Sequence, residues 1–255
     1  MTKEFTILNK DLKVDLNNPI DLSLTSKSQN SFKAWYVKEV QYRTIQGEGF
    51  TGSVKEGGAV NFREILINPH GNTTHTESVG HISELDVFIN ETLNHFHFLA
   101  QVISLTPEII EKDKNEIQKK GDRCIFLDQI LNKIDPDAEA LIIRSQKIYN
   151  ELHNKKYDGT NWPYLDRLAA KYIRDQGIKH LLIDQPSVDK ENDKGTLLSH
   201  KAFWNYPQEI DRGRTITELI GVPDHINDGI YLLNLTTINL ENDASPSRPI
   251  IYKLF

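Results

Sequence analysis

A predicted helix that runs directly into an apolar strand constrains the fold of this chain more than any other pattern. Trp162-Pro163-Tyr164 predicts the start of the helix, and Gly177 is well placed to end it. Between them, apolar residues recur at helical spacing, at Leu165, Leu168, Ala169, Tyr172 and Ile173. The run His180–Ile183 follows at once and predicts a buried strand. A helix that leads back into a buried strand is typical of α/β proteins.

The rest of the chain predicts one more helix and several strands. Thr106-Pro107-Glu108 predicts a helix start, because Thr can cap, Pro fits the first turn and Glu suits the positive helix end. Aromatic, β-branched or continuous apolar stretches predict strands at residues 34–45, 59–67, 97–105, 140–143, 230–238 and 249–254. No linker or repeat separates these elements, so we expect one α/β domain over residues 1–255.

The composition excludes several classes of function. The 255 residues carry 30 Lys and Arg against 36 Asp and Glu, a net charge of −6, without a basic cluster. Neither nucleic acid nor an anionic membrane is therefore an expected partner. The apolar runs are far shorter than the ~18 residues of a spanning helix, and the amino terminus has no apolar signal core. Cys124 is the only cysteine, which excludes an internal disulfide and a Cys-rich zinc site. We expect a cytoplasmic protein.

Three of the nine histidines fall in one short segment, His70-Gly71-Asn72-Thr73-Thr74-His75-Thr76-Glu77-Ser78-Val79-Gly80-His81. Imidazole and carboxylate are the ligands that Zn²⁺ or Mn²⁺ accept where no thiolate is available. If the segment is extended, His75, Glu77 and His81 point to one side, whereas His70 needs a bulge or turn at Gly71-Asn72 to join them. The segment is a candidate metal site, and the alternative is a polar loop with incidental histidines.

This segment resembles the metal-dependent cyclase family, which includes bacterial kynurenine formamidase and isatin hydrolase. The family signature is His-x-Gly-Thr-His-x-Asp-x-Pro-x-His. Thr74, His75 and His81 fall in register with it, while Glu77 stands at the Asp position and Val79 at the Pro. The first family histidine falls on Gly71, so a one-residue insertion would leave His70 as the ligand.

The resemblance continues downstream and spans most of the chain in order. Residues 177–189, from Gly177 through Asp184-Gln185-Pro186-Ser187-Val188 to Asp189, resemble the family's Gly-Ile-Asp-Thr-Pro-Ser-Val-Asp strand and turn. Other segments are similar to the opening strand, a downstream ligand histidine, a late ligand glutamate and the Asp-Ala-Ser-Pro-x-Arg close: Asp21-Leu22-Ser23, His200, Glu218 and Asp243 to Arg248.

The resemblance implies a swivelling β/β/α fold and a metal-dependent amidohydrolase. It implies one or two divalent metals, zinc first and manganese as the alternative, on His70, His75, Glu77, His200 and Glu218. Metal-bound hydroxide would attack the carbonyl of a non-peptide amide, and His81 would deliver a proton to the leaving nitrogen. The activity implied first is arylformamidase hydrolysis of N-formylkynurenine to kynurenine and formate, a step of tryptophan catabolism, by a homodimer.

Three alternatives stay open at this point. The substrate could be a cyclic amide such as isatin. The displaced His70 could leave the metal site incomplete on a non-catalytic protein that binds a small molecule. A purely structural metal is the third alternative, and it would show as stability lost on chelation without hydrolysis.

Several other residues have structural interpretations. Asp184 and Ser187 are expected to shape a turn, Asp243 and Arg248 to pair with each other or brace the carboxyl terminus, and Cys124 to be a small buried apolar residue. Residues 47–52 match G-x-G-x-x-G, but no helix is predicted after them, so we reject a nucleotide site. This loop is a candidate cover for the active site, and Trp35, Tyr36 and Phe50 are candidates for the substrate pocket.

Overall fold

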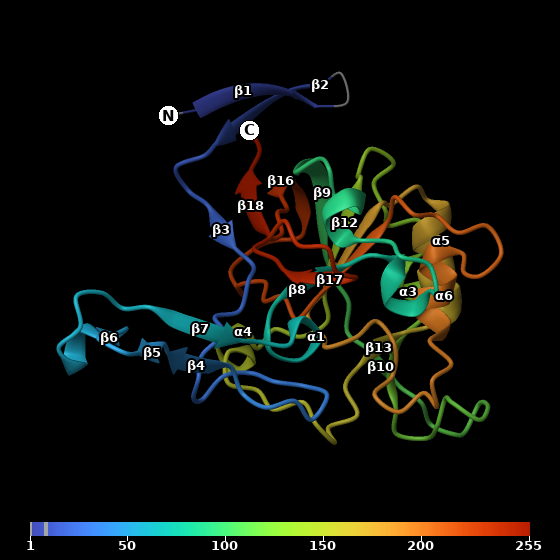
Figure 1. The fold of residues 1–255 in the computed structure, drawn as a ribbon. Helices are drawn as coiled ribbons and strands as arrows, with labels where there is room; N and C mark the ends of the chain where they lie inside the picture. The colour runs from blue at the N-terminus through green and yellow to red at the C-terminus, as the bar shows by residue number, and fades with distance from the viewer. Residues whose placement is uncertain (1, 8–9) are drawn as a thin grey trace.

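A nine-stranded sheet runs through the computed structural model, which describes residues 2–7 and 10–255 (Figure 1). Its four central strands, from β15 to β9, are parallel, and the flanking strands are antiparallel. The order across the sheet is β17 (Ala244–Pro246), β8 (His75–Glu77), β15 (Thr215–Glu218), β14 (His180–Ile183), β12 (Ala140–Arg144), β9 (His97–Ser104), β16 (Gly229–Asn234), β18 (Ile250–Lys253) and β3 (Ile20–Asp21).

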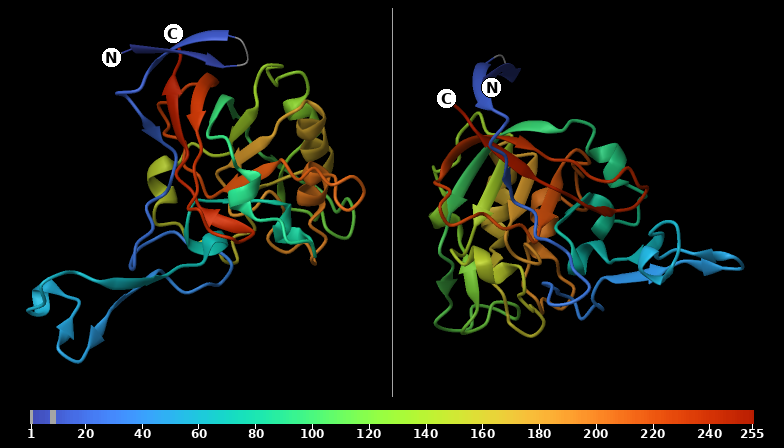
Figure 2. Two further views of the ribbon diagram at one scale, coloured as in Figure 1. Left: turned by 45° about the horizontal axis from the view of Figure 1, so that its top comes forward. Right: turned by 90° about the vertical axis from the view of Figure 1, so that its left-hand side faces the viewer.

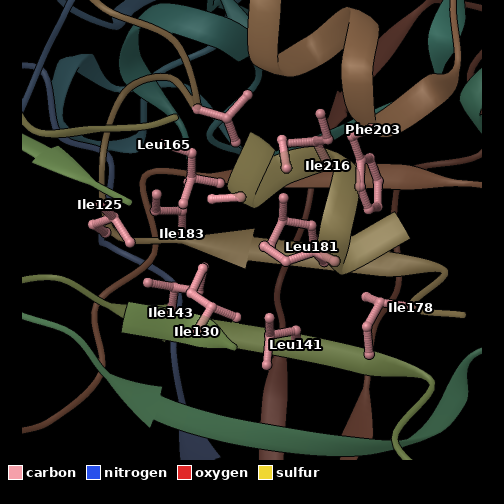
Figure 3. Close-up of a cluster of buried hydrophobic side chains, with 14 of the residues drawn as sticks. Ile125, Ile130, Leu141, Ile143, Leu165, Ile178, Leu181, Ile183, Phe203 and Ile216 are labelled. Atoms are coloured by element: carbon pink, nitrogen blue, oxygen red, sulfur yellow. The ribbon is translucent and has the colours of Figure 1, made fainter. Parts of the chain in front are cut away.

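The central strands are apolar throughout because both faces of the sheet are covered. Leu141 and Ile143 of β12 point to the face that packs against helices α3 (Leu127–Ile130), α5 (Arg167–Asp175) and α6 (Leu198–Trp204). Figure 3 shows this cluster, in which Phe203 of α6 and Ile216 of β15 lie beside the strand residues.

The opposite face packs on the outer strands of the same sheet. Ala140 and Ile142 of β12 share a buried cluster with Leu233 of β16 and Ile251 of β18. Because strands several positions apart contribute to one cluster, the sheet must curve around it. This architecture confirms the predicted α/β class, and the core strands at 140–143 and 180–183 lie where the sequence predicts them.

Smaller elements surround the sheet. A three-stranded sheet contains β10 (Glu108–Ile109), β11 (Arg123–Ile125) and β13 (Tyr164–Leu165). Strands β1 (Thr2–Ile7) and β2 (Lys10–Asp15) form a hairpin at the amino terminus. Short helical turns complete the body, at α1 (Pro69–Asn72), η2 (Val79–Ile82), α2 (Ile89–Thr92) and α4 (Tyr149–Leu152). No helix in the described part of the chain is long and apolar enough to cross a membrane.

Residues 41–66 form an arm that projects away from the body (Figures 1 and 2). Strands β4 (Gln41–Thr44) and β7 (Arg63–Leu66) pair at its base, and β5 (Gln46–Gly47), β6 (Phe50–Thr51) and the turn η1 (Val54–Glu56) form its outer part. The loop at residues 47–58 therefore lies at the far end of the arm from β8, and the expectation that it covers the active site is wrong.

Several predicted boundaries need correction. The helix predicted from Thr106 is absent, because Glu108–Ile109 instead pairs with β11 as a short strand. The helix predicted from Trp162 begins at Arg167, where the Asp166 side chain caps it by accepting from Leu168 N. The apolar residues just before that cap belong to β13 instead.

The strand expected over residues 34–45 is also shorter than predicted. Only Gln41–Thr44 is a strand, because Trp35 and Tyr36 have φ values of 61° and 54° and turn the chain. Of the strand predicted at residues 59–67, the structure has only Arg63–Leu66 as a strand.

Candidate metal centre

The pairing of β8 with β15 places two of the predicted ligands side by side. His75 on β8 lies directly opposite Glu218 on β15, and Glu77 lies opposite Ile216. Residues opposite each other on antiparallel strands have side chains in contact, and alternate residues share a face. His75 Nε2 accordingly lies 3.5 Å from Glu218 Oε2 and 3.8 Å from Glu77 Oε2, and all three residues are buried.

Helix α1 brings His70 to the same place by a single turn. The Asn68 side chain caps this turn by accepting from Gly71 N, and Pro69 occupies its first position. His70 Nδ1 then lies 3.2 Å from Glu77 Oε2. His70 was expected to join His75 and Glu77 only through a bulge or turn at Gly71-Asn72, and helix α1 is that turn.

Gly71 is required at this turn by its surroundings. A Cβ at Gly71 would lie 2.5 Å from Val37 Cγ2 and 2.9 Å from the Ala34 carbonyl oxygen. The position that matches the first family histidine thus has no space for a side chain, and the imidazole comes from the preceding residue.

His81 reaches the cluster through the turn η2 and not along an extended strand. Ser78 caps this turn by accepting from Gly80 N. The expectation that His81 shares one face of an extended strand with His75 and Glu77 is therefore wrong, because the strand ends at Glu77. Its Nε2 lies 3.8 Å from Glu77 Oε2, and its Nδ1 lies 3.2 Å from Asp243 Oδ2.

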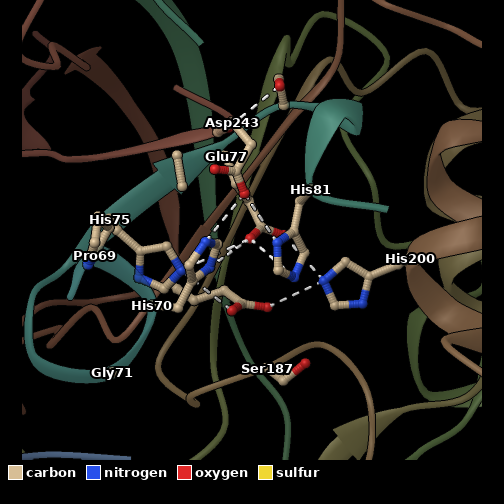
Figure 4. Close-up of polar contacts among 12 residues, drawn as sticks. Pro69, His70, Gly71, His75, Glu77, His81, Ser187, His200 and Asp243 are labelled. Carbon is tan, nitrogen blue, oxygen red and sulfur yellow. Dashed lines mark hydrogen bonds and ion pairs between the residues drawn. The ribbon is translucent and has the colours of Figure 1, made fainter. Parts of the chain in front are cut away.

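Asp243 binds two of the histidines at once. The same oxygen, Oδ2, lies 3.2 Å from His70 Nε2 and from His81 Nδ1 (Figure 4). These hydrogen bonds hold the pKa of Asp243 well below its usual range. An ionised carboxylate only accepts, so both ring nitrogens donate to it. The expectation that Asp243 pairs with Arg248 is wrong, since Arg248 Nε donates to Asp21 at 2.8 Å.

Helix α6 supplies His200, and Asp189 fixes its orientation. The Asp189 carboxylate accepts from the backbone N–H groups of Ser199 and His200, and it lies 2.6 Å from His200 Nδ1. The Asp189 carboxylate therefore both caps helix α6 and binds Nδ1 of the His200 ring. The other nitrogen, His200 Nε2, faces inward and lies 3.0 Å from Glu77 Oε1 and 3.7 Å from Glu218 Oε1.

Glu77 lies at the centre of this cluster, and two buried atoms of the cluster have no hydrogen-bond partner among the described residues. These atoms are His75 Nε2 and Glu77 Oε2. Burying a polar atom without a partner costs free energy. A bound cation would remove this cost, because a ring nitrogen and a carboxylate oxygen can both coordinate it. Two donor groups that share Glu77 have ligand atoms within 4.8 Å of one another, one with His70 and His81 and one with His75 and Glu218.

The charges within the cluster balance each other. Burial alone would raise the pKa of Glu77, but His81, His200 and His70 hold it well below its usual value. Burial alone would lower the pKa of His70, but the carboxylates of Asp243 and Glu77 raise it to about 10. Metal ions compete with protons for imidazole nitrogens, so this dense carboxylate–imidazole cluster is chemically suited to a divalent cation.

A cavity of about 410 Å³ opens beside the cluster. Its wall combines apolar and polar groups, contributed by Trp35, Val37, Asn68, His70, His81, Ser187, Leu197, His200 and Glu218. Trp35 and Leu197 have φ values of 61° and 47°, which is uncommon for non-glycine residues and concentrates at functional sites. The volume is in the range of small-molecule sites. Of the predicted pocket residues, Trp35 lines this cavity, whereas Tyr36 and Phe50 do not.

The structure brings all six predicted site residues together: His70, His75, Glu77, His81, His200 and Glu218. Two further residues, which were not predicted as site residues, lie against them. Asp243 and Asp189 both hydrogen-bond the histidines of the cluster. Both fall inside segments that resemble the family, and that position was the available signal. Nothing in the spacing of the sequence indicates which carboxylate faces which imidazole.

Comparisons with known proteins identify the family. The pattern of the Cyclase family, described as "Putative cyclase", matches residues 14–190. A kynurenine formamidase of Bacillus thuringiensis is 28% identical over 202 residues, which cover 78% of this chain and 83% of that protein. A kynurenine formamidase of Bacillus cytotoxicus is 34% identical over 93 residues, 36% of this chain and 41% of that protein.

Solved structures show the same fold at low sequence identity. A predicted metal-dependent hydrolase of Bacillus stearothermophilus superimposes with a TM-score of 0.61 at 17% identity, over 92% of this chain and 98% of that one. An isatin hydrolase bound to the product analogue thioisatinate gives a TM-score of 0.65 at 13% identity, over 92% of each chain. Together with the match over residues 14–190, these comparisons show that the chain belongs to the cyclase family.

Proposed function

We propose that this chain is a metal-dependent hydrolase of a non-peptide amide bond, with an N-formyl arylamine such as N-formylkynurenine as its substrate. The observation that carries the proposal is the position of Glu77, whose carboxylate faces imidazoles and a second carboxylate beside a cavity of about 410 Å³. Membership of the cyclase family and the similarity to kynurenine formamidases support the choice of reaction.

Five residues would hold the metal in this proposal: His70, His75, Glu77, His200 and Glu218. Zinc is the first candidate and manganese the second, because both accept this set of nitrogen and oxygen donors. A divalent ion in such a site lowers the pKa of water and polarises a carbonyl oxygen. Asp189 holds the His200 ring with Nε2 facing the cluster, and this kind of support raises metal affinity.

His81 would act as the general acid. Its Nδ1 donates to Asp243, so Nε2 is the nitrogen left to exchange a proton over the cluster. In the hydrolysis, water would add to the formyl carbon and give one proton to His81 Nε2, the C–N bond would break, and His81 Nε2 would pass that proton to the departing nitrogen, leaving formate and the free amine. His81 also lines the cavity, so it can reach a bound substrate.

The cavity wall supports an aromatic amide as substrate. Trp35, Val37 and Leu197 form its apolar part, while the ring of Trp35 is held edge-on by Trp162, with ring centroids 4.9 Å apart. A planar aryl group fits an apolar wall of this kind, with its amide directed at the polar cluster.

The proposal is tested by metal analysis and substrate hydrolysis on protein purified without a polyhistidine tag. We expect one or two equivalents of zinc or manganese in the wild type and in His95→Ala, whose exposed side chain lies outside the cluster, and a loss of metal in His75→Ala. N-formylkynurenine should be hydrolysed by the first two proteins only. Hydrolysis of a cyclic amide alone would replace the substrate but keep the reaction class. Metal without hydrolysis of either amide would favour a structural role.

A further inference from the structure

Outside the imidazole–carboxylate cluster, only two polar side chains line the cavity among the described residues, and these are Asn68 and Ser187. The remaining wall is apolar and consists of Trp35, Val37 and Leu197. No lysine or arginine is therefore among the described residues that line this cavity. Beyond the cluster itself, a bound substrate meets apolar surface and two neutral polar groups.

The orientation of the Asn68 amide is fixed by the turn that it caps. Its Oδ1 accepts from Gly71 N at 3.0 Å. A backbone N–H can only donate, so the atom that faces it must be the amide oxygen and not the nitrogen. The Asn68 Nδ2 group is therefore turned away from Gly71 N, and it has no acceptor among the described residues. Two N–H donors are left for a partner in the cavity.

Ser187 is a less selective group than Asn68. Its Oγ accepts from Asp189 N at 3.1 Å. The hydroxyl keeps one proton to donate and a further lone pair to accept, so it suits either kind of partner. Asn68 Nδ2 can only donate, so its partner on the substrate must be an acceptor. Asn68 is thus the polar group of this wall that can discriminate between substrates.

The position of Asn68 limits where on the substrate this acceptor lies. Asn68 is two residues before His70, at the start of the turn that Figure 4 shows beside the cluster. With the scissile amide at the cluster and an aryl ring on the apolar wall, the group that faces Asn68 is the ring substituent next to the amide. A neutral carbonyl suits this wall better than a carboxylate, which would lose hydration without gaining a cation.

We propose that Asn68 determines the substrate specificity of this site, and that the substrates are aryl amides with a carbonyl oxygen ortho to the amide nitrogen. Asn68 Nδ2–H donates to this oxygen and so orients the ring. This inference rests on the proposed function and narrows it. N-formylkynurenine and isatin both carry such a carbonyl, so the inference does not depend on whether the amide is open or cyclic.

Two formamides that differ only in the ortho carbonyl group test this inference: 2-formamidoacetophenone and formanilide. Their kcat/KM values are compared in metal-loaded wild type and Asn68→Asp. Aspartate keeps an oxygen that can cap α1 but has no N–H to donate. The substitution should lower kcat/KM for 2-formamidoacetophenone about tenfold more than for formanilide, the size of one lost hydrogen bond. The intrinsic reactivity of the two compounds cancels in this comparison.

Two further variants separate recognition from charge and from structure. Asn68→Ser also retains a capping oxygen but stays neutral, and it should change the ratio of the two kcat/KM values in the same direction. The matched control is Asn115→Asp, because Asn115 Oδ1 likewise accepts from a backbone N–H, that of Ile117, and Asn115 is not among the lining residues. Asn115→Asp should keep the wild-type ratio. A loosened α1 turn would lower both kcat/KM values equally and leave their ratio unchanged.

Binding of the amine products tests the inference without hydrolysis. By calorimetry, wild type should bind 2-aminoacetophenone about tenfold more tightly than aniline, and Asn68→Asp should lose this preference. Absence of hydrolysis of both formamides by wild type would contradict the proposed function and leave the binding measurement to decide on Asn68. A preference of the same size in wild type and Asn68→Asp, measured by hydrolysis or by binding, would overturn the inference.

Discussion

His81 is held at one ring nitrogen and open at the other. Its Nδ1 lies 3.2 Å from Asp243, while its Nε2 is 3.8 Å from Glu77 at the edge of the cavity. His81→Ala should therefore lower kcat by about 10²–10⁴-fold, the usual contribution of a positioned acid or base. Metal content should stay at the wild-type value, because the other donors remain.

Kinetics and elemental analysis on the same preparation separate the two roles of this residue. Loss of metal in His81→Ala would make it a ligand, consistent with the donor group that it forms with His70 and Glu77. Unchanged kcat with unchanged metal would exclude it from both roles. His95→Ala, which changes an exposed histidine hydrogen-bonded to its neighbour Asn94, is the control for both measurements.

Gly71 decides whether α1 can deliver His70 to the cluster. In Gly71→Ala the added methyl would meet Val37 at 2.5 Å and the backbone oxygen of Ala34 at 2.9 Å. Overpacking of this kind costs about 1–3 kcal/mol, so the free energy of unfolding should fall by that amount in denaturant titration. Gly213→Ala is the matched control, because its nearest contact is Asp211 at 3.5 Å. Equal stability of the two variants would contradict the packing argument.

At the scale of elements, the strands with apolar residues on both faces were predictable and the short polar elements were not. Periodicity located β12 and β14, because burial on both faces leaves a continuous apolar run. It misplaced the start of α5, because the apolar residues of β13 continue the helical spacing. The strand β10 was missed because it pairs with β11, a partner that no local pattern reveals.

The buried histidine on β14 gives a prediction about acid stability. His180 contacts the ring of Phe98, with centroids 4.0 Å apart, and its Nδ1 lies 2.8 Å from Thr215 Oγ1. Burial lowers the pKa of His180 to about 3. The unfolded chain binds a proton at this residue below about pH 6.5, while the folded chain does not until about pH 3. Stability at this site is therefore lost as the pH falls from 6.5 toward 3.

His180→Gln removes this titration. The difference in unfolding free energy between wild type and His180→Gln should shift by about 2 kcal/mol between pH 7.5 and pH 5, to the disadvantage of the wild type, at about 1.4 kcal/mol for each pH unit below 6.5. Denaturant unfolding at the two pH values measures it. A difference that stays constant with pH would mean that the pKa of His180 is the same in the folded and the unfolded chain.

At the scale of the whole molecule, the candidate centre draws its residues from segments far apart in the chain. The donors come from residues 70–81, from α6 and from β15, and Asp243 comes from the segment just before β17. The sequence alone predicted the donors through their resemblance to a family. It could not predict which carboxylates orient them, because the contact of Asp189 with His200 and of Asp243 with His81 depends on the packing of the sheet.

Because these segments are distant in sequence, a metal that joins them should stabilise the whole fold. At a free metal concentration of 100 times Kd, binding adds about 2.7 kcal/mol to the free energy of unfolding. For a chain of this size that corresponds to a rise in Tm of roughly 5–10 °C, at about 2–4 °C for each kcal/mol. Calorimetry of chelated and reloaded protein should show this rise in the wild type and in His95→Ala. In His75→Ala the rise in Tm should be lost, because His75 on β8 faces Glu218 on β15 and both are proposed metal ligands. An identical Tm with and without metal in the wild type would mean that no ion joins these strands.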